Sequence, residues 1–147
     1  MLKSGILKIG EGTMEEKIER KNIEVVAGVI VENGKIFATQ RGYGDFKDGW
    51  EFPGGKIEKG ETREQALERE LREELEIKVE VGKFIKTIQY DYPKFHLTMH
   101  CFLVKIVEGT PNLLEHEAAK WITKEQIDDI AWLPADVELI EELKKIL

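Results

Sequence analysis

The pattern of apolar and polar residues is clearest over Ile23–Arg41, where it predicts a β-hairpin. The apolar, β-branched run IEVVAGVIVE is followed by Asn33-Gly34 and then by KIFATQR. Asn-Gly supplies the two positive φ angles that a two-residue type I′ turn requires. Because the first run is almost continuously apolar, we expect it to form a central strand that is covered on both faces.

The rest of the chain predicts further strands, two long helices, and a short helix from Lys124 to about Asp129 that Thr123 can cap. Periodicity predicts strands over residues 78–92, 95–107 and 119–122. Thr62-x-x-Gln65 has the form of a capping box, so a helix should begin near Arg63. Ala135–Leu147 predicts an amphipathic helix at the C-terminus. Helices in mid-chain and at the end, among strands, predict an α/β fold in which a mixed sheet is packed between helices.

Length and composition limit the class of protein. A chain of 147 residues fits one domain with a sizeable core. Residues 1–22 show no clear core face and predict an N-terminal tail, part of it disordered, whereas residues 23–147 predict a single domain. No apolar run approaches the ~18 residues that span a bilayer, and the first residues lack a secretory signal. We therefore expect a cytoplasmic protein without a membrane partner.

Charge and cysteine content narrow the class further. The single cysteine, Cys101, excludes an internal disulfide and lies in a strand-like segment, which predicts an inert core thiol. A net charge of −7 argues against nucleic acid as a partner, because duplex binding relies on clustered Lys and Arg. It leaves room for a small phosphorylated ligand that binds together with a divalent metal.

The stretch Gly49–Ile77 carries the candidate chemistry. On a helical wheel, its leucines form an apolar stripe, and three glutamates lie along or beside the edge of that stripe: Glu70, Glu73 and Glu74. Like charges so close together repel one another, and those beside an apolar edge are partly desolvated, so the cluster is costly unless a cation neutralises it. Hard carboxylate oxygens suit Mg²⁺, with Mn²⁺ as the second candidate.

The turn before this helix is suited to a close approach of the backbone to a ligand. Pro53-Gly54-Gly55 leaves no side chain in the way, and a backbone carbonyl there can complete a metal shell. In the helix, Arg69 can pair with Glu73 at i+4. The alternative is that the acidic helix is a solvated, salt-bridged surface and the turn only a turn. The fixed spacing of the two around a capping box favours a site.

The residues Gly55-x5-Glu61-x7-Arg69-Glu70-Leu71-x-Glu73-Glu74-x-Glu76-Ile77 resemble the Nudix box, G-x5-E-x7-R-E-U-x-E-E-x-G-U, where U is a bulky apolar residue. One position departs, because Glu76 stands where the family has the glycine that ends the helix. We expect an altered helix exit rather than lost metal ligands. The resemblance implies an α/β/α sandwich, dependence on Mg²⁺, and hydrolysis of a nucleoside diphosphate linked to another moiety.

Carried over by position, the resemblance assigns roles to individual residues. The metal-binding and catalytic carboxylates are Glu70, Glu73 and Glu74. The region of Gly55 supplies a backbone ligand, and Arg69, with Glu61, orients the carboxylates. A water molecule activated by the metal, with a glutamate as base, is expected to attack a phosphorus in line.

The resemblance extends over most of residues 23–147 and is closest to the MutT-like nucleoside triphosphate pyrophosphohydrolases. The segments that carry it are IFATQR, EFPGGKIEKGET, YDYPKFHLTMHCF, EHEAAKWIT and WLPADVELI. It implies that Glu115 brings a further catalytic, metal-binding carboxylate to the site, with a plain surface glutamate as the alternative. It also implies that Arg41 contacts a phosphate, and the alternative there is a solvated strand end.

Two residues are candidates for contacts with the base. Asp136 resembles the base-reading position, where guanine-specific members can carry asparagine. A carboxylate accepts the amino group of cytosine, or of guanine if suitably protonated; the alternative is that Asp136 caps the last helix. Phe52 is a candidate for stacking on a base, although an aromatic residue beside a strand is more often part of the core.

The sequence thus predicts a Mg²⁺-dependent, MutT-like Nudix hydrolase that cleaves NTP or dNTP to the monophosphate and pyrophosphate. As a pool-cleaning enzyme, it would act on 8-oxo-dGTP or on cytidine nucleotides. We expect a monomer or homodimer whose partner is a small nucleotide. One alternative is another Nudix substrate, such as a nucleotide sugar, ADP-ribose or a dinucleoside polyphosphate. The other is a Nudix module that senses a nucleotide without cleaving it, and the three intact glutamates argue against that.

Overall fold

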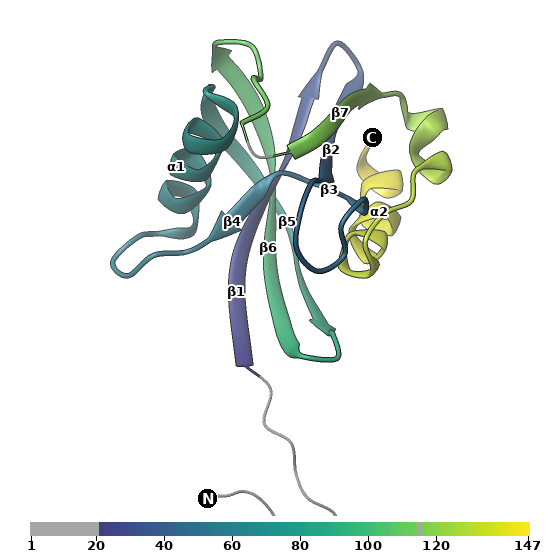
Figure 1. Ribbon diagram of the computed structural model, residues 1–147. Helices are drawn as coiled ribbons and strands as arrows, with labels where there is room; N and C mark the ends of the chain where they lie inside the picture. The colour runs from purple at the N-terminus through teal and green to yellow at the C-terminus, as the bar shows by residue number, and fades with distance from the viewer. Residues whose placement is uncertain (1–20, 115) are drawn as a thin grey trace, which may run out of the picture.

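A computed structural model describes residues 21–114 and 116–147 and shows a mixed sheet between two helices (Figure 1). The strands are β1 (Lys21–Glu32), β2 (Lys35–Arg41), β3 (Trp50–Glu51), β4 (Gly54–Lys56), β5 (Lys78–Asp91), β6 (Phe95–Glu108) and β7 (His116–Ile122). The helices are α1 (Arg63–Leu75), the 3-10 helix η1 (Lys124–Asp129) and α2 (Pro134–Ile146). The predicted α/β/α sandwich with a mixed sheet is confirmed. The predicted tail lies outside the described residues, apart from its last two residues, which already belong to β1.

The sheet is built around β1. Its path has the order β3-β2-β1-β6-β5, and in addition β4 pairs with β1 and β7 with β2. β1 runs parallel to β6, while its pairs with β2 and β4 are antiparallel. Alternate residues of a strand face opposite sides, so Val26 and Ile30 pack in the core under α1, whereas Ala27 and Val29 pack in the core under α2. The predicted central strand with two covered faces is confirmed.

Two local predictions are confirmed in atomic detail. Asn33 and Gly34 both have positive φ angles, 52° and 75°, and the hairpin closes with Glu32 opposite Lys35. At the start of α1, the Thr62 hydroxyl accepts the Gln65 N–H at 3.1 Å, and the Gln65 side chain accepts the Thr62 N–H at 3.0 Å. The reciprocal bonds fix where α1 begins.

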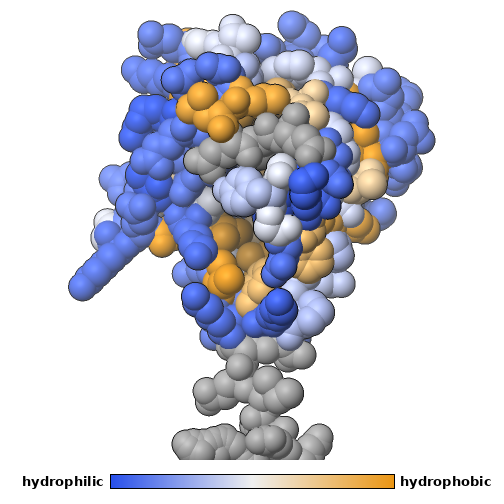
Figure 2. All heavy atoms as spheres, in the orientation of Figure 1, coloured by the Kyte–Doolittle hydropathy of each residue, from blue (hydrophilic) through white to orange (hydrophobic). Residues whose placement is uncertain are grey.

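α1 and α2 cover opposite faces of the sheet (Figure 1). The inner residues of α1 are fully buried, and they are Ala66, Leu67, Leu71 and Leu75. Its outer face is charged, and it forms a hydrophilic side of the molecule in Figure 2. The buried residues of α2 on the other face include Leu139, Ile140 and Leu143. Within the described part of the chain, no helix has the length and apolar character needed to cross a membrane.

Several elements begin or end one to three residues from their predicted bounds, and two of these differences, in β7 and the last helix, have a clear physical cause. β7 begins at His116 rather than at residue 119, because it pairs with β2 as far as Arg41. The last helix begins at Pro134, whose fixed φ and missing N–H suit the first helical position. Its N-cap is Leu133, which makes no side-chain capping bond. Asp136 is therefore not the N-cap of α2, although it lies in its first turn.

The exit of α1 shows how the chain accommodates Glu76. The expected change in the backbone is not found, because Glu76 itself takes the left-handed conformation, with φ 58° and ψ 39°. Its N–H donates to the Arg72 carbonyl at 3.0 Å, and its carboxylate accepts the Asn112 side-chain N–H at 2.7 Å. A left-handed conformation costs a non-glycine residue ~1 kcal/mol. The helix thus ends in the way that glycine would end it, at the expense of stability.

We expect Glu76→Gly to raise the free energy of unfolding by ~1 kcal/mol, because glycine adopts this conformation without a steric cost. Urea unfolding at neutral pH measures the change. Glu76→Ala is the matched control, since it loses the bond to Asn112 but keeps the unfavourable φ, and it should be less stable than the parent. A Glu76→Gly protein less stable than the parent would show that the Asn112 contact outweighs the backbone cost.

Candidate active site

The turn before α1 lies directly against the acidic cluster. A Cβ added to Gly55 would lie 2.4 Å from Cδ and 2.5 Å from Oε1 of Glu70, so only a glycine leaves room for this carboxylate. A Cβ on Gly54 would lie 1.9 Å from the Val26 carbonyl oxygen of β1. Gly54 is therefore required by its close approach to the backbone of β1, and at Gly55 bare backbone lies beside the Glu70 carboxylate. The predicted metal ligand from the backbone at Gly55 stays a prediction.

Arg69 organises the acidic cluster. Its Nε and Nη2 bind the two carboxylate oxygens of Glu61 at 2.6 and 2.9 Å. Its Nη1 reaches Glu70 Oε2 at 3.0 Å and Glu73 Oε1 at 3.2 Å, the latter being the predicted i+4 pair. Nη2 also donates to the Lys56 carbonyl at 3.0 Å, at the end of β4. One guanidinium thus joins the loop before α1, the turn and two of the three glutamates.

The bidentate ion pair between Arg69 and Glu61 shifts the pKa of both residues in the direction that keeps them charged. The hydrogen bonds from Arg69, and after them the one from the Glu58 N–H, lower the pKa of Glu61 to about 2. The same hydrogen bonds raise the pKa of Arg69, against the opposing effect of its burial. Both groups therefore stay charged across the neutral range. Glu61 anchors Arg69, and Arg69 in turn orients Glu70 and Glu73.

The donors of this cluster fit a hard divalent cation. Glu70 and Glu74 are half-buried and Glu73 is exposed, and all three offer carboxylate oxygens on one helix. Gly55 keeps bare backbone beside them. Among residues 21–114 and 116–147, no three acidic, histidine or cysteine side chains already converge as a ready metal cage. In the present arrangement Arg69 supplies the positive charge that holds Glu70 and Glu73.

A second polar group lies at the other end of the same turn. Arg41 ends β2 and binds Glu51 of β3 with Nε 3.2 Å from Oε2 and Nη2 2.9 Å from Oε1. Its Nη1 donates to the Asp45 carbonyl at 3.3 Å. Burial lowers the pKa of Arg41, but the hydrogen bonds and charge of Glu51 outweigh it, so that the pKa is raised. Arg41 is therefore a half-buried cation fixed by its ion pair with Glu51, and not a solvated residue at a strand end.

Asp136 is buried, with 4% of its surface exposed, and its carboxyl group feels the charges of Arg41 and Glu51, the second polar group. Its Oδ2 accepts the Phe52 backbone N–H at 3.0 Å. Burial raises the pKa of Asp136 to about 8, with the charge of Glu51 in support and with the Phe52 N–H and Arg41 in opposition. The carboxyl group can therefore exist as a hydrogen-bond donor or acceptor near neutral pH.

The structure corrects the expectation for the Phe52 ring. That side chain is 4% exposed, and its ring stacks on Trp132 with centroids 4.7 Å apart at 16°. The ring is thus part of the core and has no face open to a base. The contribution of Phe52 to the site comes from its main chain, through the N–H that binds Asp136.

Sequence reasoning missed two residues of this second group. The first is Glu51, which binds Arg41. The sequence offered one hint of its role, because this charged residue stands between two aromatic residues in a strand-like segment. Tyr92 is 5% exposed, and its hydroxyl accepts the Ala135 N–H at 3.1 Å at the start of α2. Burial raises the pKa of Tyr92 to about 12. The sequence around Tyr92 gives no comparable hint, because it shows only a second tyrosine two positions after the first in a strand.

Glu115, the predicted further catalytic carboxylate, lies outside the described residues. The chain enters β7 at His116, opposite Arg41 of β2. The predicted thiol Cys101 is buried, as expected, and burial raises its pKa.

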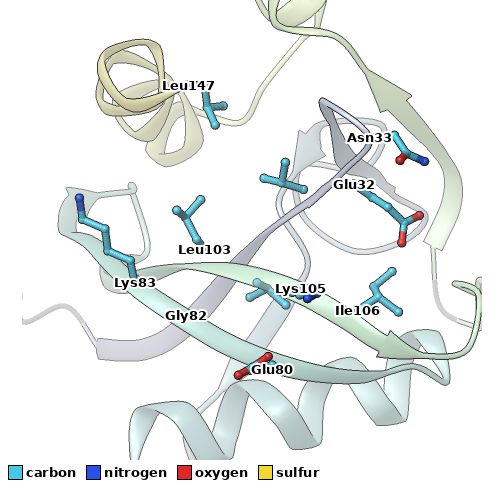
Figure 3. A pocket seen from close by; sticks show the side chains of 11 residues that line it. Glu32, Asn33, Glu80, Gly82, Lys83, Leu103, Lys105, Ile106 and Leu147 are labelled. Carbon is cyan, nitrogen blue, oxygen red and sulfur yellow. The ribbon is translucent and has the colours of Figure 1, made fainter.

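A groove of about 620 Å³ lies apart from both polar groups (Figure 3). It opens between β5, β6, the hairpin of β1 and β2, and Leu147 just after α2. Leu147 and Asp136 are separated by nearly the whole of α2, which corresponds to ~16 Å of helix. The groove contains none of the predicted site residues.

The fold, the Gly55 turn and the Arg69-centred glutamates together define a Nudix domain, and a family model described as "NUDIX domain" matches residues 22–143. The chain belongs to the Nudix family and is a Nudix hydrolase. It is 40% identical over 122 residues to the CTP pyrophosphohydrolase of Escherichia coli strain K12. The aligned residues make up 82% of this chain and 90% of the relative.

Other relatives agree with this assignment. The 8-oxo-dGTP diphosphatase of Haemophilus influenzae is 38% identical over 128 residues, 86% of this chain and 94% of the relative. The solution structure of the E. coli ORF135 protein has a TM-score of 0.75 at 37% identity, and the match covers 86% of this chain and 91% of that one. Nudix enzymes generally use divalent metals, and the donors described above are compatible with this.

We expect Glu61→Gln to weaken the dependence of stability on pH in the acid range. The pKa of Glu61 is lowered from 4.5 to about 2, so its contribution is present above pH 4.5 and is lost as the pH falls towards 2. Urea unfolding between pH 2 and 5 should give a flatter profile for the variant than for the parent. Glu64→Gln, an exposed glutamate in the first turn of α1, is the control. Identical profiles for parent and Glu61→Gln would contradict the role of this pair.

Proposed function

We propose that this Nudix hydrolase is a Mg²⁺-dependent nucleoside triphosphate pyrophosphohydrolase, which releases a nucleoside monophosphate and pyrophosphate. One observation carries the proposal. The five residues Glu51–Gly55 connect the buried Asp136 carboxyl group and Arg41 at one end with the acidic cluster at the other. A nucleotide has the same polarity, with a base at one end and a polyphosphate at the other. The relatives named above act on such molecules, which supports the proposal.

At the phosphate end, each residue has a definite task. Glu70, Glu73 and Glu74, with the backbone at Gly55, would hold the cation. Bound Mg²⁺ would neutralise phosphate oxygens and increase the acidity of the attacking water. A carboxylate oxygen of one glutamate takes the proton from that water. Arg69 keeps Glu70 and Glu73 oriented, and Glu115 would supply a further carboxylate.

At the base end, Arg41 and Asp136 select the substrate. Arg41 would contact a phosphate through Nη1, which otherwise donates to the Asp45 carbonyl at 3.3 Å, because its other nitrogens are bound to Glu51. Asp136 would read the base edge, as acceptor from the cytosine amino group when ionised and as donor when protonated. The likeness to a CTP pyrophosphohydrolase and to 8-oxo-dGTP diphosphatases favours cytidine nucleotides and 8-oxo-dGTP, in a role of cleaning the nucleotide pool.

A Mg²⁺-dependent hydrolysis panel with product identification tests the reaction. We expect cleavage of (d)NTPs or 8-oxo-dGTP, and we expect Glu73→Gln to reduce kcat at least ~10²-fold, the scale of losing one catalytic electrostatic element. Glu68→Gln on the exposed side of α1 is the matched control and should keep normal turnover. Activity confined to ADP-ribose, nucleotide sugars or dinucleoside polyphosphates would overturn the proposal. Binding without any turnover would indicate a nucleotide sensor, and near-normal turnover in Glu73→Gln would overturn the metal assignment.

The base-reading role of Asp136 predicts a pH-dependent preference. Its pKa is raised to about 8, so the group is mainly a donor below this pH and an acceptor above it. We expect kcat/KM for CTP relative to 8-oxo-dGTP to rise as the pH increases through about 8. Asp136→Asn should change the preference and remove this pH dependence, since its amide does not titrate. An unchanged profile in the variant would leave Asp136 with a purely structural role.

A further inference from the structure

The loop between β2 and β3 is tightly tied to the base end of the site. The Arg41 N–H donates to the Gly49 carbonyl at 2.9 Å, and the Asp48 N–H donates to the Arg41 carbonyl at 2.8 Å. The Gln40 side chain donates to the Asp48 carbonyl at 2.9 Å. A Cβ added to Gly49 would lie 2.2 Å from Leu133, the N-cap of α2. The loop is thus held between the end of β2 and the start of α2.

Within this loop, Phe46 is in an unfavourable conformation. Its φ is 64°, and that of Asp48 is 75°, in the left-handed region that non-glycine residues avoid. Residues held in such a conformation persist only where the surrounding structure enforces it, and they cluster at functional sites. The ring of Phe46 is only partly covered, with 39% of the residue exposed. The residue thus combines an unfavourable backbone conformation with incomplete packing of its ring.

The ring of Phe46 lies on an aromatic cluster beside the base-reading group. Its centroid is 4.9 Å from that of Tyr92, at a tilt of 55°. Tyr92 stacks on Phe95 at 5.0 Å, and its hydroxyl binds the N–H of Ala135, the neighbour of Asp136. An unfavourable backbone therefore presents a half-open aromatic ring that is linked to the start of α2, where Asp136 lies, through Tyr92 and Ala135.

We propose that Phe46 is a substrate-contacting residue that stacks on the nucleobase and sets the affinity of the site for it. The proposal rests on the proposed function, because it requires a nucleotide whose base lies at Asp136. Asp136 reads the edge of the base, whereas Phe46 supplies contact to a ring face, which every base has. Phe46 thus determines affinity, and Asp136 determines which base is preferred.

The test compares KM and kcat of Phe46→Ala with those of the parent, on CTP and on ribose 5-triphosphate, which lacks a base. Loss of one base–aromatic stack corresponds to ~5-fold or more in KM. We expect KM for CTP to rise by at least this factor, with kcat nearly unchanged, and both constants for ribose 5-triphosphate to stay the same. Phe46→Trp should retain the low KM for CTP.

Phe84→Ala is the matched control. Phe84 is 43% exposed and packs on a single ring, that of Phe102 at 5.3 Å, so it loses a similar contact outside the proposed site. Its KM should equal that of the parent. Phe46→Gly serves as a second variant, because it removes the ring and also relieves the left-handed strain, so poor folding cannot explain its raised KM.

The outcomes separate the two proposals. If the parent cleaves no nucleoside triphosphate, the proposed function itself fails. If the parent cleaves CTP and both Phe46→Ala and Phe46→Gly keep its KM, the role of Phe46 alone is overturned. A lower KM in these variants also overturns it, since the ring would then occupy the place of the base. An equal rise of KM for ribose 5-triphosphate would show a general distortion of the site instead of stacking.

Discussion

The segment from Glu51 to Gly55 is the constraint on which the site depends. Within five residues it binds Arg41 through the Glu51 carboxylate, Asp136 through the Phe52 N–H, and β1 through the Pro53 carbonyl, which accepts the Gly28 N–H at 2.8 Å. Gly55 then passes within contact of the Glu70 carboxylate. A shift of this segment along β1 would therefore disturb both ends of the site together.

The two ends use the same electrostatic construction. In each, one arginine is held in bidentate fashion by one glutamate, Arg69 by Glu61 and Arg41 by Glu51. The anchoring glutamate fixes the plane of the guanidinium, and the remaining nitrogens are left to orient other groups. Around Arg69 these groups are acidic side chains, and around Arg41 the remaining nitrogen reaches a loop carbonyl. Lysine cannot replace either arginine in this arrangement, because it lacks the planar fork.

Local patterns predicted the features whose causes are local. The Asn33-Gly34 turn and the Thr62 capping box depend on neighbouring residues, and both appear as expected. The acidic cluster was also predictable, since one helix carries it. The pairing of β7 along β2 was not, because strand ends are set by a distant partner. For the same reason the burial of the Phe52 ring and the contact from Tyr92 to α2 could not be foreseen: both depend on which elements meet in space.

The bond from the Phe52 N–H to Asp136 has a consequence for how this enzyme can diverge. The donor belongs to the main chain, so no side-chain replacement at position 52 removes it, except proline, which has no N–H. The orientation of the buried carboxyl group is thus insulated from mutation at its partner. The ring at that position is free to vary within the limits of core packing, while the bond that positions the carboxyl group is retained.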